Sequence, residues 1–129
     1  MKRALAFLFD ESMEHVLLFR FVHGLNGVPA ICLPGEVPHA AIARRIYELS
    51  GKVINPLALS WFGNLECTMY IGAETKFMDC YCGTIDSVNA PNAEWHDVSE
   101  FDVFSDITWV NAPHLIRAAL AYLKPVSSE

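Results

Sequence analysis

The chain has 129 residues, of which 53% are apolar and 19% are charged, and its formal net charge is −6. A chain of this length can form a single domain with a real hydrophobic core. We place that domain at residues 1–125 and a tail at 126–129. No apolar run approaches the roughly 20 residues that span a bilayer. The negative charge argues against an extended nucleic-acid-binding surface.

The first apolar run begins directly after Lys2 and Arg3 and superficially resembles a secretory signal. It ends at Asp10 and Glu11 with no small-residue cleavage site behind it, so we expect a buried strand and a cytoplasmic protein. The first quarter of the chain predicts a strand over 3–9, a turn over 10–13, a strand over 14–20, a loop over 21–29 and a short strand over 30–33.

A turn, one amphipathic helix and a stop are predicted around residues 33–51. Pro38 fits the first helical turn, where its missing N–H would have no helical partner. Gly51 fits the left-handed residue that closes a helix. The apolar stripe between them consists of Ile42, Ile46 and Leu49.

The second half of the chain predicts short strands and a final helix. Its β-prone segments lie at 52–54, 65–71, 76–82 and 95–98, with a tight turn at Gly63-Asn64 and a loop over 83–93. Ser99 is a candidate N-cap for a helical turn over 100–103, and 113–124 predicts a second helix. The fold class is therefore α+β.

The stretch from Glu36 to Gly51 resembles the signature of the Nudix family, G-x5-E-x7-R-E-U-x-E-E-x-G-U, in which U is a bulky aliphatic residue. With the two aligned on Gly51, Glu36 takes the early Glu, Arg44 the Arg and Glu48 the first of the paired acids. Four positions depart from the pattern: Ala30 for the opening Gly, Arg45 for Glu, Leu49 for the second paired Glu and Lys52 for the last aliphatic.

The resemblance implies a mixed β-sheet sandwiched between α-helices. It also implies an enzyme that holds Mg²⁺ or Mn²⁺ on helical carboxylates and hydrolyses nucleoside diphosphates linked to another group. Helical periodicity puts Arg45, Glu48 and Lys52 on one flank, so the single carboxylate there lies between two cations. We therefore predict a Nudix-like pseudoenzyme whose metal site is lost and which needs no cofactor.

Three functions follow from this interpretation. The favoured one is binding of a nucleotide, a nucleoside-diphosphate derivative or a protein partner without cleavage. Its candidate ligand-binding residues are Arg44, Arg45, Glu48, Lys52 and His39. The alternatives are an active, Mg²⁺- or Mn²⁺-dependent pyrophosphohydrolase with relocated ligands, and a purely structural or inhibitory protein. In the active alternative the catalytic acids are Glu36 and Glu48, helped by an acid from the segment Glu94–Asp106.

The remaining chemistry-bearing residues have simpler explanations. The four cysteines are expected to be reduced thiols, with zinc binding as the alternative. The aromatic side chains Trp61, Phe62, Trp95 and Trp109 are expected in the core or a dimer interface, although one of them could stack on a ligand. The high apolar content leads us to expect a homodimer.

Overall fold

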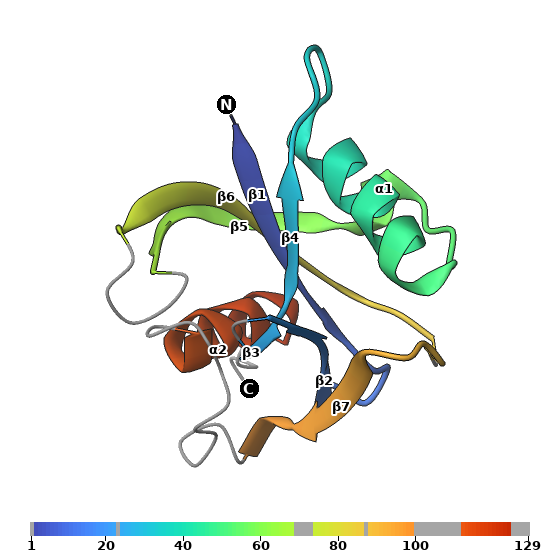
Figure 1. The fold of residues 1–129 in the computed structure, drawn as a ribbon. Coiled ribbons are helices and arrows are strands. Elements are labelled where there is room, and N and C mark those ends of the chain that lie inside the picture. Colours follow the sequence, from blue (N-terminus) through green and yellow to red (C-terminus); the bar gives the residue numbers. More distant parts are fainter. Residues whose placement is uncertain (1, 23, 69–73, 87, 100–111, 125–129) are drawn as a thin grey trace.

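The computed structural model describes residues 2–22, 24–68, 74–86, 88–99 and 112–124 (Figure 1). Two helices and seven strands occur in these ranges. In chain order they are β1 (Arg3–Phe9), β2 (His15–Phe21), β3 (Gly24–Asn26), β4 (Val28–Ile31), α1 (Pro38–Ser50), a short 3₁₀ helix (Pro56–Ala58), β5 (Ser60–Cys67), β6 (Lys76–Thr84), β7 (Ala93–Asp97) and α2 (Ala112–Leu123). Neither helix is long and apolar enough to cross a membrane.

The strands form one mixed sheet around β1. The order is β3-β2-β1-β6-β5, with β4 also paired to β1 and β7 also paired to β2. The β1–β6 pair is parallel, and the other pairs are antiparallel. Residues Ala4 to Phe9 of β1 are all buried. Because both faces of this strand are covered, its sequence is a continuous apolar run instead of an alternating one.

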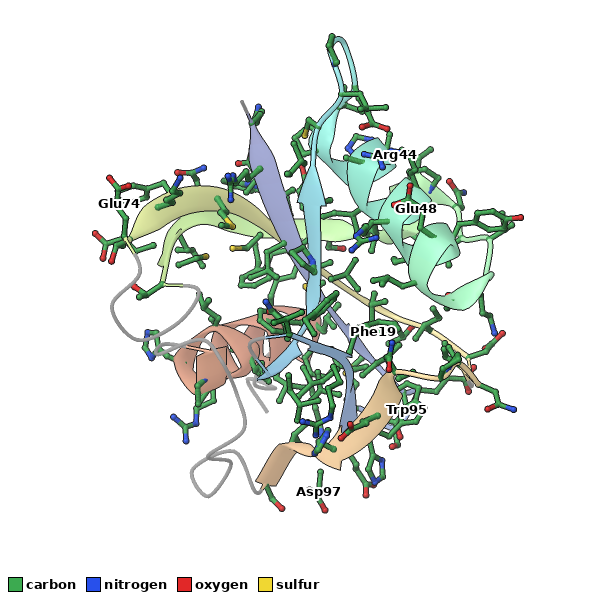
Figure 2. The ribbon with its side chains drawn as sticks, in the orientation of Figure 1. Phe19, Arg44, Glu48, Glu74, Trp95 and Asp97 are labelled. Atoms are coloured by element: carbon green, nitrogen blue, oxygen red, sulfur yellow. The ribbon has the colours of Figure 1, made fainter. Side chains whose placement is uncertain are left out.

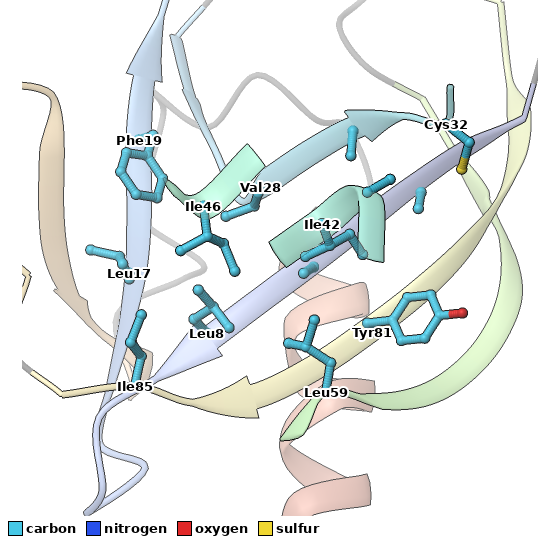
Figure 3. Close-up of a cluster of buried hydrophobic side chains, with 14 residues drawn as sticks. Leu8, Leu17, Phe19, Val28, Cys32, Ile42, Ile46, Leu59, Tyr81 and Ile85 are labelled. Carbon is cyan, nitrogen blue, oxygen red and sulfur yellow. The ribbon is translucent and has the colours of Figure 1, made fainter. Parts of the chain in front are cut away.

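The two helices cover opposite faces of the sheet. Alternate residues of β1 belong to separate buried clusters, because successive side chains of a strand point to opposite faces. One cluster joins Leu5, Phe7 and Phe9 to Leu115, Ile116 and Ala119 of α2. The other joins Ala4, Ala6 and Leu8 to Ala41, Ile42 and Ile46 of α1 (Figure 3). This arrangement confirms the predicted mixed sheet between helices.

The helix α1 begins and ends where the sequence predicts. Pro38 is its first residue, and the preceding Val37 provides no side-chain cap. Gly51 adopts φ +74°, and its N–H donates to the carbonyl of Tyr47 at 2.7 Å. The left-handed conformation favours glycine, which has no Cβ, and it turns the chain away from the helix axis.

Several predicted connections are wrong, two of them at glycines that lie between or within strands. The predicted loop over 21–29 contains β3 and the start of β4, and Gly27 lies between them. Gly63-Asn64 is not a turn but part of β5, at an irregularity in the pairing between Trp61 and Gly63. Residues 52–54 form no strand. The predicted helical turn over 100–103 and the tail lie outside the described residues.

Candidate functional site

Arg44 joins the loop before α1 to the helix itself. Its Nε and Nη2 atoms donate to the two carboxylate oxygens of Glu36, both at 3.0 Å. Nη2 also donates to the carbonyl of Ile31 at 2.9 Å, and Glu36 accepts from the Leu33 N–H at 2.9 Å. The hydrogen bonds from Arg44, with that from Leu33, hold the pKa of Glu36 below its ordinary value. The bidentate pair makes Glu36 an ionised acceptor fixed against the helix.

Glu48 lies one turn further along α1 and faces two guanidinium groups. Nη1 of Arg44 is 3.3 and 3.4 Å from its two carboxylate oxygens, and Nη1 of Arg45 is 3.4 Å from one of them. Figure 2 shows Arg44 and Glu48 together on this helix. These are long contacts, and the Glu48 side chain is 45% exposed, so each pair adds little stability.

Two further predicted members of this group, Lys52 and His39, have contacts with residues outside it. Lys52 comes after the left-handed Gly51, and its Nζ lies 3.8 Å from Asp86. Helical periodicity fails there because α1 has already ended. The His39 ring is half-buried, and its centroid lies 6.1 Å from that of Tyr81 with the rings tilted by 50°. The helical periodicity used to place Lys52 beside Glu48 therefore stops at Ser50, before it reaches Lys52.

A small pocket of about 250 Å³ opens beside Arg45. Its lining comes from β1, β4, α1 and β6, and consists of Arg3, Ala4, Pro29, Ala30, Ile31, Arg45 and Met78. No motif singles out Arg3, which becomes a neighbour of α1 only because β4 pairs with β1. The pocket thus combines two arginine side chains with mostly apolar walls.

Glu36, in the loop before α1, and Glu48, on α1, are the two carboxylates of the signature stretch. Mg²⁺ prefers hard oxygen ligands, chiefly carboxylates, in an octahedral arrangement. Here Glu36 and Glu48 share the guanidinium of Arg44. Leu49, at the position of the second paired acid, packs partly buried against the core. Across the described ranges, no three His, Cys, Asp or Glu side chains gather as metal ligands would.

The late acidic segment is only partly described. Glu94 accepts from Nε of Arg20 at 2.7 Å and lies 3.0 Å from Nε2 of His96. The hydrogen bond from Arg20 lowers the pKa of Glu94 despite partial burial. Asp97 accepts from the backbone and hydroxyl of Ser99. The other predicted acids, Glu100, Asp102 and Asp106, lie outside the described residues.

The cysteines are buried free thiols. Cys67, Cys80 and Cys82 face one core cluster, as the spacing of the last two predicts, and Cys32 belongs to the other. Burial raises the pKa of Cys82 to about 12. A thiol with so high a pKa carries almost no thiolate at neutral pH and is a poor nucleophile.

The aromatic side chains are divided between core and surface. Phe62 packs against the core cluster on the α2 side, and Trp95 packs against the cluster on the α1 side. Trp61 is 50% exposed and donates from Nε1 to Asp79 at 3.2 Å. Trp109 lies outside the described residues.

No family model matches the sequence, and no curated protein does. Solved structures do match the fold. An Ap4A hydrolase from C. elegans has 17% identity and a TM-score of 0.69, with 95% of this chain and 97% of that chain covered. The NUDIX domain of Shewanella oneidensis NrtR, complexed with ADP ribose, has 13% identity and a TM-score of 0.73, covering 95% and 88%. This chain has the Nudix fold.

A third Nudix-fold neighbour, a NUDIX hydrolase from Nitrosomonas europaea, has 16% identity and a TM-score of 0.67, covering 94% of this chain and 86% of that one. The fold implied by the stretch from Glu36 to Gly51 is thus confirmed. At these identities the likeness concerns the fold, so the chemistry must be argued from the side chains of this chain.

Proposed function

We propose that this chain binds a phosphorylated nucleoside derivative in the pocket at Arg45 and does not cleave it. The observation that carries the proposal is that Arg45 and Arg3 line one small pocket, at the helix where the Nudix signature has acids. Arg3 has no side-chain partner among the described residues, and Arg45 has only a 3.4 Å contact with Glu48. Both guanidinium groups therefore have donors to offer an anion.

The arginine side chains of the pocket favour a phosphate group as ligand. A metal ion would need carboxylate ligands instead. Guanidinium groups form bidentate hydrogen bonds with phosphate oxygens, and these charge-assisted bonds are about twice as strong as neutral ones. A volume of about 250 Å³ is below the roughly 300–1,000 Å³ of complete ligand pockets. It suits the phosphate portion of a ligand whose remaining groups lie on the apolar walls.

We expect no cleavage because arginine side chains already hold the two acids of the signature, Glu36 and Glu48. Hydrolysis in this fold, as the resemblance implies, needs carboxylates that hold a metal ion. Glu36 is held by two hydrogen bonds from Arg44, and Glu48 faces both Arg44 and Arg45. A divalent cation brought to these acids would also meet the charge of two guanidinium groups.

Calorimetric titration in EDTA tests the binding. ADP-ribose and diadenosine tetraphosphate are the first probes, because structural neighbours include an ADP-ribose complex and an Ap4A hydrolase. We expect Arg45→Gln and Arg3→Gln each to weaken binding about tenfold, close to 1.4 kcal/mol. Lys124→Gln, which removes an exposed charge from the end of α2, should leave it unchanged. Equal weakening by all three variants would indicate non-specific attraction.

The same ligands with Mg²⁺ or Mn²⁺ test for cleavage. We expect no products by chromatography. Turnover that disappears in Glu48→Gln would instead establish the active pyrophosphohydrolase with relocated ligands. If no nucleotide binds and none is cleaved, the structural or inhibitory function stands in its place.

A further inference from the structure

A second and larger cavity, of about 600 Å³, lies at the other end of β1. It is formed by the β1–β2 turn, the segment after β6, and β7. The described lining consists of Asp10, Glu11, His15, Ile85, Asp86 and Trp95. Arg3 begins β1 and Asp10 follows its end, so the extended strand places these two lining residues about 23 Å apart. The larger cavity is therefore not part of the site at Arg45.

The floor of this cavity is apolar and aromatic. Ile85 is only 6% exposed, and Trp95 is half-buried against the same core cluster. Trp95 lies on β7 opposite Leu17 of β2, which fixes the position of its backbone. A half-buried indole leaves part of its surface open to a ligand, and such a surface attracts alkyl groups and cations.

The β1–β2 turn holds one carboxylate firmly in place. Oδ1 of Asp10 accepts from the backbone N–H groups of Glu14 and His15, both at 3.0 Å. Oδ2 accepts from the Ser12 hydroxyl at 3.0 Å and lies 2.8 Å from Nδ1 of His15. Because Nδ1 is used in this contact, Nε2 of His15 is the ring atom left to meet a ligand.

The rim carries two further carboxylates on exposed side chains, Glu11 and Asp86. The Asp86 side chain is 76% exposed and already attracts one cation of this chain, the Nζ of Lys52 at 3.8 Å. With three carboxylates against one imidazole, the lining is negative even when His15 is protonated. This charge would repel an anion, including the phosphate group that we expect to bind at the opposite end of β1.

We propose that this cavity binds an organic cation, an ammonium or guanidinium group on a short alkyl stem. The stem lies on Ile85 and Trp95, and the charged end lies between the indole face and the carboxylates. Cation–π contact and charge attraction act together there. The net charge of −6 adds a field that draws cations toward the molecule.

Two probes that differ only in charge test the proposal. Butylguanidine carries a guanidinium group, and butylurea is its neutral isostere with the same stem. Calorimetry with the full chain should give millimolar or tighter binding of butylguanidine and at least tenfold weaker binding of butylurea. If butylguanidine does not bind, or if butylurea binds equally well, the proposal is wrong.

Three variants locate the binding. Glu11→Gln combined with Asp86→Asn changes only exposed side chains, so the fold is retained, and it should weaken butylguanidine at least fivefold. Lys52→Gln removes the competing cation and should strengthen binding. Glu74→Gln is the matched control: it is exposed and lies at the far side of the molecule from Trp95 in Figure 2. Weakening by Glu74→Gln to the same extent as by the double variant would refute the site.

The source of the cation is distinguished with N-acetyl-arginine amide, which presents the same group on a peptide backbone. Binding as tight as that of butylguanidine identifies an arginine side chain of a protein partner as the occupant. Binding at least tenfold weaker identifies a free small amine. Nucleotide binding at Arg45 is measured separately, so failure of either proposal leaves the other standing.

Discussion

The Asp10–His15 pair shows how one short turn changes two ionisations. Partial burial works to raise the pKa of Asp10, but the hydrogen bonds from His15 and Ser12 outweigh it and bring the pKa down to about 2. The hydrogen bond to Asp10 raises the pKa of His15 above its ordinary value. Both shifts favour the charged forms, so Asp10 and His15 form an ion pair at any pH between their two pKa values.

Asp10→Asn should lower the pKa of His15 toward its ordinary value, as measured by NMR titration of the imidazole ring. Asp97→Asn is the control, because Asp97 acts on His15 only through space and should lower its pKa less.

The Asp10 contribution to stability is lost as pH falls from about 4 toward 2, and that of His15 is lost as pH rises through its raised pKa. The stability difference between wild type and Asp10→Asn should therefore be largest between about pH 4 and pH 6.5. A difference that does not vary with pH would contradict this account.

At the scale of elements, Arg44 connects β4, the following loop and α1. Through Glu36 and the carbonyl of Ile31, a single guanidinium group fixes the end of a strand to the first turns of a helix. Arg45 is adjacent in sequence but contacts only Glu48, at 3.4 Å. Two neighbouring arginines on one helix therefore have different effects, and substitution can separate them.

Arg44→Ala should lower the free energy of unfolding by about 1–3 kcal/mol, because it leaves Glu36 without its charged partner. Arg45→Ala should lower it by less than about 0.5 kcal/mol, since its pair with Glu48 is long and exposed. Urea denaturation of the two variants measures both values, and alanine in either place suits a helix equally well. Equal losses would mean that Arg44 does not fasten the loop to α1.

The sequence predicts the helices and buried strands of this fold well, because periodicity and composition determine them locally. It fails where glycine has a tertiary role. A Cβ on Gly27 would lie 2.5 Å from the carbonyl oxygen of Ala6 and 2.9 Å from the Phe7 ring, so this glycine permits close approach to β1. Gly63 lies at the irregularity within β5. From sequence alone, glycine predicts a turn at both positions. The adjacent residues do not reveal that another strand lies beside each glycine.

The sequence likewise predicts part of the candidate site and misses another part. The spacing of Glu36, in the loop before α1, and of Arg44 and Glu48, on α1, brings the three side chains together in the structure. Helical periodicity predicts Lys52 on the same flank, but α1 ends at Ser50, before this residue. Arg3 could not be found from sequence, since its approach to Arg45 depends on the pairing of β1 with β4.

At the scale of the whole molecule, exposed apolar side chains gather around the loop between β4 and α1. Ile31, Leu33 and Val37 are 47%, 54% and 50% exposed. This loop projects from the body of the fold in Figure 1, and Arg44 and Glu36 hold its base. A firmly held apolar projection is a suitable contact between copies of the chain.

We expect light scattering to give twice the 14.4 kDa mass of one chain. Leu33→Glu should shift the mass to that of the monomer, because it places a charge in the apolar contact. Val22→Glu, at a residue that is 98% exposed elsewhere on the surface, should leave the dimer intact. A monomeric wild type would remove the dimer expected from the composition.

The parallel pairing of β1 with β6 determines when the sheet can close during synthesis. Ala4 pairs with Asp79, so β1 cannot complete this pairing until residues 75 positions later have been synthesised. Closing so long a loop is entropically costly before the contacts form, and domains rich in such pairings fold slowly. Until then, the buried run from Ala4 to Phe9 is an apolar segment with an open edge, which is the form in which a nascent chain most needs a chaperone.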